Sequence, residues 1–367
     1  MMKKLVLCSV FCFLCIISKA QIVSLSTAEL TKLKSLIRSE ADVKKQWEDL
    51  LKTANESLEA TPNPSDTILT EGILQGDPRK TRTWKSIEDM QKVYSLAFAY
   101  KITGEKKYLA KTSEFLLAWA QRNQPQGNPI NDTNLDRIIF AYDLVKNDLS
   151  DDINLATNLW LMKVGLQEIK SFNKAANGKS LTYMNNWNSH RIKEVAEVAW
   201  AINNDSLKTW VIDIYKKQIA KNLNQDGSSF DFHERDALHY HIYDVDPLMV
   251  AATILNRDGK FGESAYSYKS PEGNSLKNSV DWLVPFFTGE KTHAEWVNSK
   301  SSFDKKRAAN GEKGYIAGTL FKPQEARTSI ALANYFDKGM LAIYQANINS
   351  KSKYPTWQFV LNEVKRK

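Results

Sequence analysis

Apolar residues recur at intervals of three and four positions along almost the whole chain, and this helical spacing limits the fold most strongly. Within residues 26–60, leucines and Trp47 fall on one stripe, and residues 105–122 repeat the pattern with Phe115 and Trp119. Alternating strand patterns are scarce, and no glycine-rich phosphate-binding loop is present. The sequence therefore predicts an all-α protein.

Helical segments of similar length, separated by short turns, predict antiparallel hairpins. Gly104 is suited to end one helix in a left-handed conformation and to begin the next hairpin arm. No strict sequence period indicates a regular solenoid. We therefore predict a ring of hairpins, an (α/α) toroid or incomplete barrel, whose loops line a cleft at one end. We expect its helices at residues 86–103, 105–122, 133–146, 152–172, 189–203, 206–223, 237–255, 275–287, 323–336 and 339–348.

Residues 61–85 interrupt the helical pattern with three prolines and two glycines. Long irregular segments often form lids or binding loops, so we predict a lid or rim loop here. The basic part of the segment has two interpretations. It is either a solvated turn or the part of a lid that places Lys80, Arg82 and Trp84 on an anionic, ring-shaped substrate.

The first twenty residues are typical of a cleaved signal peptide. Lys3 and Lys4 precede an apolar run at residues 5–17, which is short for a membrane span, and Ser18-Lys19-Ala20 supplies small residues near a cleavage point. A lipoprotein signal and a retained anchor helix are the alternatives. We predict an exported protein, periplasmic or secreted, with no stable membrane anchor and with residues 21–367 as a single domain.

Cysteine usage and charge narrow the chemistry further. All three cysteines lie within residues 1–20, so the mature chain has no disulfide, no thiolate nucleophile and no cysteine-bound metal. The formal charge of +8 falls to about +5 when the three lysines of that segment are removed. Because there are no long runs of lysine and arginine, an anionic glycan fits this charge better than nucleic acid does.

Two polar islands are difficult to explain as core. The first, Tyr183–Arg191 (YMNNWNSHR), precedes a predicted helix, and capping by one side chain accounts for only part of it. The second, Asp226–Leu248 (DGSSFDFHERDALHYHIYDVDPL), concentrates three of the five histidines with arginine, tyrosine and acidic residues. Such mixtures of amide, imidazole, guanidinium and phenol groups are typical of a functional site.

These side chains suit β-elimination on a uronic acid polymer. The proton on sugar carbon C5 lies beside a carboxylate, and it becomes acidic only when the charge of that carboxylate is neutralised. Asparagine, histidine and arginine donors can hold the developing negative charge. A base then removes the C5 proton and an acid protonates the leaving oxygen O4. A tyrosine can serve as both when neighbouring cations stabilise its phenolate.

Other chemistries remain open at this point. His233, His239 and His241 are possible metal ligands, although neither HExxH nor another recognised spacing is present. A glycoside hydrolase would need two carboxylates, and Asp226–Leu248 offers several, among them Asp236. A serine hydrolase lacks the G-x-S-x-G elbow. A glycan-binding protein without activity is the third alternative.

From about Trp84 to Phe336 the chain resembles the alginate lyase family. The resemblance rests on residues 94–119 (YSLAFAYKITGEKKYLAKTSEFLLAW), 128–143 (NPINDTNLDRIIFAYD), NNWNSHR at 185–191, and the motifs ALHYH and DPL within 226–248. It implies a helical-toroid polysaccharide lyase that acts on mannuronate and guluronate polymers. Two positions depart from the better-known branch of the family. Trp187 stands where that branch has histidine, and His233 stands where it has arginine.

The resemblance and the chemistry of these residues together indicate which side chains form the site. Tyr240 is expected to be both base and acid, and His190 a second base for the opposite C5 epimer. Asn186, His190 and Arg235 are expected to neutralise the carboxylate, and we expect no metal and no cofactor. Alginate is the expected substrate, with glucuronan-type polymers as the alternative. Substrate contacts are expected from Asn185, Trp187, Arg191, His233, His239, His241, Lys80, Arg82 and Trp84.

Overall fold

The structure, a computed structural model, describes residues 21–366, and the expected signal peptide at residues 1–20 lies outside them. The prediction of an all-α protein is confirmed, since a two-stranded antiparallel hairpin is the one sheet among the described residues. Within residues 21–366, no helix combines the length and the apolar composition that crossing a membrane requires.

The helices follow one another with short connections through most of the chain. The α-helices are α1 (Thr27–Ser39), α2 (Ala41–Ser57), α3 (Pro78–Thr103), α4 (Lys106–Arg122), α5 (Pro129–Asp132), α6 (Asp136–Val145), α7 (Asp151–Ala176), α8 (Asn186–Ala201), α9 (Asp205–Asn222), α10 (Phe230–Arg235), α11 (Leu238–Asp258), α12 (Leu276–Thr288), α13 (Ser302–Ala309), α14 (Arg327–Ala333), α15 (Met340–Ile348) and α16 (Trp357–Lys365). Short 3₁₀ helices are η1 (Thr133–Leu135), η2 (Lys146–Asp148), η3 (Lys313–Tyr315) and η4 (Pro323–Ala326), and the strands are β1 (Ala294–Glu295) and β2 (Thr319–Leu320).

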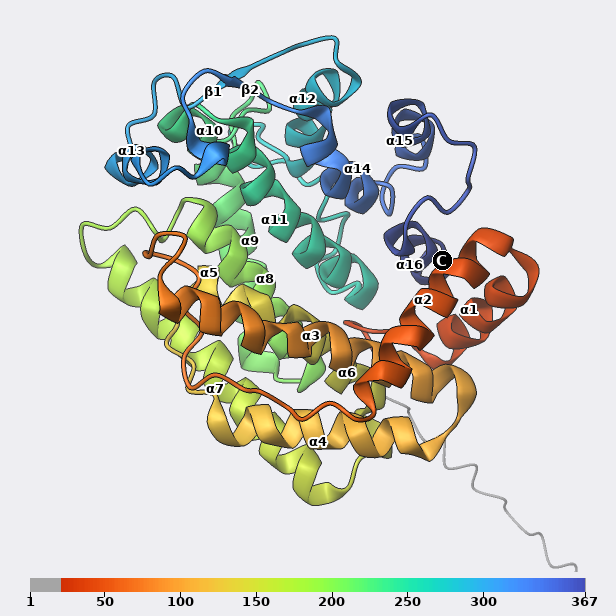
Figure 1. Ribbon diagram of the computed structural model, residues 1–367. Coiled ribbons are helices and arrows are strands. Elements are labelled where there is room, and N and C mark those ends of the chain that lie inside the picture. Colours follow the sequence, from red (N-terminus) through yellow and green to blue (C-terminus); the bar gives the residue numbers. More distant parts are fainter. Residues whose placement is uncertain (1–20, 367) are drawn as a thin grey trace, which may run out of the picture.

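The helices form a ring of hairpins, and the ring is closed by the two ends of the chain. In Figure 1 the chain runs once around, so that blue α16 returns to red α1 and α2. Lys32 on α1 donates to the carbonyl of Glu363 on α16 at 2.5 Å, and Gln46 on α2 donates to the carbonyl of Tyr354 at 2.6 Å. The helical-toroid prediction is therefore confirmed.

The inner wall of the ring consists of buried helices, of which α8 is the most enclosed. Every residue of α8 except Trp187 is buried, and α8 packs against α7, α9 and α11. A helix that is buried on all sides belongs to the interior of a large protein. Because α8 begins at Asn186 and α11 begins at Leu238, the two polar islands of the sequence lie at the start of two adjacent helices.

The structure corrects the expected boundary between the irregular segment and the helix that follows it. Helix α3 begins at Pro78, whereas the sequence analysis expected the segment 61–85 to remain irregular as far as Lys85. Asp77 caps the helix by accepting from the backbone of Arg79, and proline fits the first helical position because its missing N–H has no helical partner there. Lys80, Arg82 and Trp84 therefore lie on the first turns of a helix, not in a loop.

The acidic side chains buried on α8 make stability depend on pH. Glu197 is 5% exposed, and burial raises its pKa to about 7. A raised carboxyl pKa adds stability that is complete below the unfolded value near 4.5 and is lost as the pH rises through about 7. We expect the free energy of unfolding to decrease over this window. Glu197→Gln should remove a contribution on the order of 3 kcal/mol to that decrease, as measured by urea unfolding across the window.

The exposed Glu88 on α3 provides the matched control for this prediction. Glu88→Gln should leave the pH dependence of the unfolding free energy as it is in the wild type. An equal flattening in both variants would contradict the assignment of the effect to burial of Glu197.

Candidate active site

A cavity of about 600 Å³ opens where the first turns of α3, α8 and α11 converge. Figure 1 shows α10, α13 and the β1–β2 hairpin grouped at this end of the ring. Several expected site residues line it together, although they are far apart in sequence. The lining residues are Thr70, Glu71, Gly72, Lys80, Trp84, Ile130, Thr133, Asn134, Asn186, Trp187, Arg235, His239, Tyr240, Tyr243, Ser301, Phe303, Arg307 and Tyr315.

Tyr240 has its hydroxyl oxygen between two guanidinium groups. Arg235 donates to it from Nη2 at 2.7 Å, and Arg307 donates from Nη1 at 3.3 Å. The guanidinium carbon of Arg235 also lies 3.6 Å from the centre of the Tyr240 ring. Hydrogen bonds from charged donors stabilise negative charge on an oxygen more strongly than neutral donors do. The two guanidinium groups therefore place positive charge directly at the hydroxyl oxygen of Tyr240.

Asp304 on α13 fixes Arg235 in this position. Its carboxylate accepts from Arg235 Nε at 2.7 Å and also from Nη2 in a bidentate pair, and Asp304 is 1% exposed. Ser299 donates to the same carboxylate at 2.6 Å. Bidentate pairing holds a guanidinium in one plane, so Asp304 orients the group that contacts Tyr240.

The start of helix α11 is positioned by the hairpin strand β1. Asp236 takes a left-handed conformation with φ 46°, which separates α10 from α11. Glu295 on β1 then accepts from the backbone nitrogens of Leu238 at 2.8 Å and His239 at 3.0 Å. These are among the nitrogens that a helix leaves unpaired at its first turn. Ala237, at the N-cap position of α11, has no side chain that could accept these hydrogen bonds. Glu295 therefore caps the helix in its place, one turn before Tyr240.

Asp231 connects the two polar islands. It is 2% exposed and accepts from the side chain of Asn186 at 2.5 Å and from the backbone of Asn186 at 2.7 Å. Asn222 donates to it as well, at 3.0 Å. Burial raises the pKa of Asp231 to about 6, and the hydrogen bonds from the two asparagines oppose that shift. The first turn of α8 is thus held against α10, with Asn186 at the cavity.

The cavity is positively charged. Lys80, Arg235 and Arg307 line it, and Glu71 is the one carboxylate among the lining residues. Three helices also direct their N-terminal ends toward it, and each helix N-terminus carries about half a positive charge. Burial and the nearby Arg307 lower the pKa of Lys80. This arrangement favours an anionic ligand.

The expected histidines take different positions. His239 lines the cavity, and burial together with Arg235 and Arg307 lowers its pKa to about 4, so its ring is neutral near pH 7. His190 lies behind the cavity wall, where its Nδ1 is 2.9 Å from the hydroxyl of Thr133 and its ring is 4.2 Å from that of Tyr243. Burial, with Lys193, lowers the pKa of His190 to about 3.

The remaining expected residues lie away from the cavity. His233 is exposed and contacts the hydroxyl of Ser228 at 2.8 Å, whereas His241 is fully buried between Ser229 and the carbonyl of Ser279. The histidines therefore do not converge, and no cluster of metal-ligating side chains is found within residues 21–366. Three other expected residues are absent from the lining: the helix cap Asn185, the exposed Arg82 and the fully buried Arg191.

Sequence reasoning missed the residues that the C-terminal part of the chain contributes. Arg307 and Tyr315 are bonded to each other at 3.0 Å, and Trp296 packs on Tyr315 with ring centres 4.9 Å apart. They lie between 56 and 75 positions beyond Tyr240, in segments without helical periodicity. The one signal in the sequence is a basic helix start at 302–309, which alone is indistinguishable from a solvated surface.

Arg191 has a structural position, and its replacement should affect stability. Its Nε lies 3.2 Å from the carboxylate of Glu168, and both side chains are fully buried. Removing one partner of a buried pair leaves an uncompensated charge and costs about 3–5 kcal/mol. We expect Arg191→Met to lower the free energy of unfolding by this amount, as measured by urea denaturation. The exposed Arg122, paired with Asp66, is the control, and Arg122→Gln should cost less than about 1 kcal/mol.

The fold is shared with solved enzymes of low sequence identity. An alginate lyase from Bacteroides ovatus superimposes with a TM-score of 0.64 at 17% identity, covering 88% of this chain and 94% of the other. Alginate lyase A1-III from Sphingomonas species A1 gives a TM-score of 0.60 at 18% identity, covering 87% and 89%. A search of curated protein sequences finds no match. The structural comparisons establish a common helical-toroid fold.

A family comparison on the sequence identifies the class. The family model described as alginate lyase matches residues 36–293, which include α3, α8, α10 and α11 and therefore most of the cavity. The toroid, the positively charged cavity and this match define a polysaccharide lyase. The chain belongs to the alginate lyase family.

Proposed function

We propose that this protein cleaves alginate by β-elimination, with Tyr240 as the proton-transfer residue. The observation that carries the proposal is the hydroxyl of Tyr240 at the cavity wall, bonded by Arg235 and Arg307. A phenolate at this position can take the C5 proton of a uronate residue. The resulting phenol then returns the proton to O4, and the bond between O4 and C4 breaks as the C4=C5 double bond forms.

The carboxylate of the sugar needs donors close to the base. Asn186 lines the cavity and donates one side-chain N–H to Asp231, and the second N–H of the same amide is the donor available to the sugar carboxylate. Arg235 and Arg307 supply positive charge beside Tyr240. Charged and preorganised donors stabilise the negative charge that develops when C5 loses its proton. Tyr240 can thus transfer the proton while these neighbouring donors bind the carboxylate of the sugar.

The geometry favours elimination in which H5 and O4 leave from the same face of the sugar. A single group that removes the proton and returns it can serve this syn arrangement. Mannuronate and glucuronate have H5 and O4 on the same face, whereas guluronate has H5 and O4 on opposite faces. A second base is needed for guluronate. His190, the expected second base, lies behind Thr133 and Tyr243 and does not line the cavity. We therefore propose mannuronate blocks as the preferred part of alginate.

Related enzymes support a saccharide ligand. Alginate lyase A1-III is known with a tetrasaccharide in a tyrosine-to-phenylalanine variant, which matches this fold with a TM-score of 0.56 at 20% identity over 74% of this chain and 79% of that chain. It is also known with a tetrasaccharide in a histidine-to-alanine variant, with a TM-score of 0.57 at 19% identity over 84% of this chain and 93% of that chain. In this protein Trp84 and Trp187 line the cavity and are suited to pack against sugar rings.

A glycoside hydrolase is less well supported. That mechanism needs two carboxyl groups on opposite sides of the scissile bond, but Glu71 is the one carboxylate among the residues that line the cavity. Asp236, the residue considered from the sequence, accepts from the backbone and side chain of Asn298 at 2.8 Å and 3.0 Å and does not line the cavity. Its place is structural.

The test is the ultraviolet absorbance of the unsaturated product. Residues 21–367 are incubated separately with polymannuronate, polyguluronate and glucuronan, and absorbance is followed with time. We expect the fastest rise with polymannuronate. A rise with glucuronan alone would identify the alternative substrate, and shortening of a polymer without absorbance would indicate hydrolysis. Absence of both changes on every polymer would refute catalysis and leave a binding function.

A further inference from the structure

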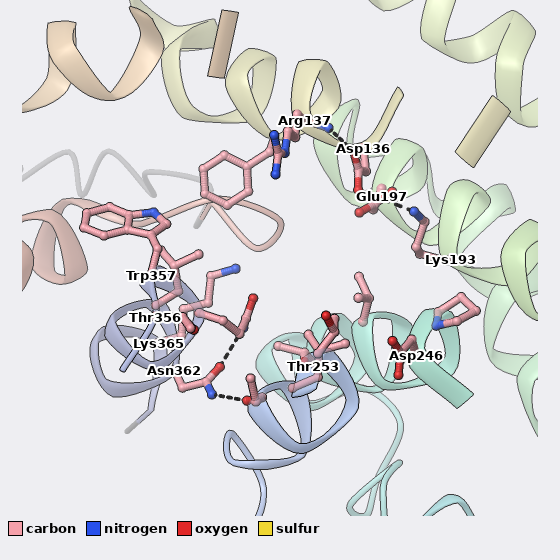
Figure 2. Close-up of a pocket in the computed structure, with 18 of the residues that line it drawn as sticks. Asp136, Arg137, Lys193, Glu197, Asp246, Thr253, Thr356, Trp357, Asn362 and Lys365 are labelled. Carbon is pink, nitrogen blue, oxygen red and sulfur yellow. Dashed lines mark hydrogen bonds and ion pairs between the residues drawn. The ribbon is translucent and has the colours of Figure 1, made fainter. Parts of the chain in front are cut away.

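A second cavity, of about 660 Å³, is lined by residues farther along α3, α8 and α11 than those that line the first. Its walls come from α3, α6, α8, α11, α14 and α16, and Figure 2 shows their side chains surrounding an open space. Cavities of this size commonly hold small organic ligands. Nothing in the proposed lyase chemistry uses it. Its charged lining residues include Arg137, Arg327, Lys365, Asp136, Glu197 and Asp246.

The second cavity is separated from the first by a partition centred on His190. Thr133 and Tyr243 line the first cavity, and both contact His190, which lines the second. His190 is 6% exposed, and its Nε2 has no hydrogen-bond partner among the described residues. A buried polar atom without a partner is costly, so a ligand or water in the second cavity would satisfy it. The two cavities therefore lie back to back.

Three of the cationic side chains that line the second cavity lack carboxylate partners among the described residues. Arg137 is bonded to the side chain of Gln91, Arg327 contacts Asn347 at 3.5 Å, and Lys365 donates to the carbonyl of Val23 at 3.0 Å. None of these three cations forms an ion pair within residues 21–366. Figure 2 shows Arg137 and Lys365 directed toward the open space from opposite walls.

The acidic side chains do not cancel this positive charge at neutral or lower pH. Asp136 is paired with Lys193 at 3.6 Å. Burial raises the pKa of Glu197 and of Asp246 to about 7, so both lose their charge as the pH falls below that value. Burial also lowers the pKa of Lys365 to about 7, so Lys365 gains its charge over the same range. The cavity becomes more positive as the pH decreases.

Aromatic rings complete the wall next to the cations. The indole nitrogen of Trp357 donates to the hydroxyl of Tyr94 at 3.1 Å, and both side chains line the cavity. Arg137 lies over the ring of Tyr94, 5.8 Å from its centre, and Lys365 lies over Phe140 at 5.2 Å. Aromatic faces beside fixed cations suit a ligand that combines a ring with a carboxylate.

We propose that the second cavity is a separate binding site for a carboxylated saccharide, held by Arg137, Arg327 and Lys365 against the Tyr94–Trp357 wall. The choice of a uronate as that saccharide rests on the proposed function. The partition at His190 makes this site distinct from the one at Tyr240, where the polysaccharide is cleaved under the proposed function. A uronate oligosaccharide released by cleavage and the end of an uncleaved polymer share the required chemistry.

Calorimetric titration with a mannuronate trisaccharide tests the proposal. The protein carries Tyr240→Phe so that the ligand is not consumed, and the same titration is repeated with Arg137→Gln and Arg327→Gln added. We expect two binding events in the first protein. The second event should weaken at least tenfold in the added variants, because two unpaired cations are removed, and it should strengthen as the pH falls from 8 to 6. Neutral mannotriose should give no second event.

Arg122→Gln, which removes an exposed arginine on α4, is the matched control and should leave both events unchanged. Arg137→Gln and Arg327→Gln in the otherwise wild-type enzyme should leave the initial rate of absorbance unchanged. One binding event at every pH, or two events that these substitutions do not affect, would overturn the second site. Thermal unfolding of each variant shows whether a lost event reflects a lost fold, and Lys365→Met then serves as the second probe.

Two further arms distinguish the sources of the ligand and the two proposals. Competition of the trisaccharide by long polymannuronate in the Tyr240→Phe protein indicates that a polymer end enters, whereas competition by the unsaturated products alone indicates a product site. Full activity of Tyr240→Phe would count against the proposed catalytic function and not against the second site. Absence of a second event in the Tyr240→Phe protein, together with normal catalysis by the wild-type enzyme, would count against the second site and not against the catalytic function.

Discussion

Replacing Tyr240 by phenylalanine should reduce the initial rate of product absorbance on polymannuronate by about a thousandfold or more. A positioned acid or base typically contributes a factor of about 10² to 10⁴, and here one hydroxyl serves in both steps. The ring is 8% exposed and packs against Trp296 with ring centres 5.7 Å apart, so phenylalanine fits the same space. Binding of the trisaccharide at the first cavity should therefore persist while turnover stops.

Tyr243 supplies the matched control for this result. It lies on the same helix, lines the same cavity and has its ring centre 6.1 Å from that of Tyr240, but no guanidinium within residues 21–366 donates to its hydroxyl. Burial raises the pKa of Tyr243 above its ordinary value, which disfavours its phenolate. Tyr243→Phe should keep the rate within about a factor of ten. A larger loss of rate in Tyr243→Phe than in Tyr240→Phe would show that Tyr243, and not Tyr240, transfers the proton.

The fold was predictable because its determinants are local. Helical spacing, Gly104 in a left-handed conformation with φ 79° and the scarcity of strand patterns all act within a few residues of one another. The start of α3 was misplaced because the prolines of residues 61–85 were all attributed to a loop. Pro78 instead begins the helix after the cap Asp77.

The part of the site that was predictable from the sequence lies at the starts of helices. Asn186, Trp187, His239 and Tyr240 line the cavity because each lies in the first turn of α8 or α11. The direction of His190 could not be inferred, since one further turn of α8 carries it into the partition, where it lines the second cavity. Contacts between segments that are far apart in sequence have no local signal either, and the contacts of Arg307 and of the cap Glu295 are both of this kind.

Arg235 should be the second most important side chain, and its loss should have two separable effects. We expect Arg235→Gln to reduce the rate on polymannuronate at least a hundredfold, because it removes the donor 2.7 Å from the hydroxyl of Tyr240. The same change leaves the buried carboxylate of Asp304 without its bidentate partner. The free energy of unfolding should then fall by about 3–5 kcal/mol, as measured by urea denaturation.

A double variant distinguishes charge stabilisation at Tyr240 from structural support. Asp304→Asn removes the stranded charge, so Arg235→Gln with Asp304→Asn should recover most of the lost stability without recovering the rate. Recovery of both would mean that Arg235 acts by supporting the fold. The remaining donor at the hydroxyl, Arg307, lies farther away at 3.3 Å and shares its Nη1 with Tyr315. Because the two guanidinium groups act on one oxygen, removing both should cost less than the product of their single effects, and measured rates of Arg235→Gln, Arg307→Gln and the pair would show this coupling.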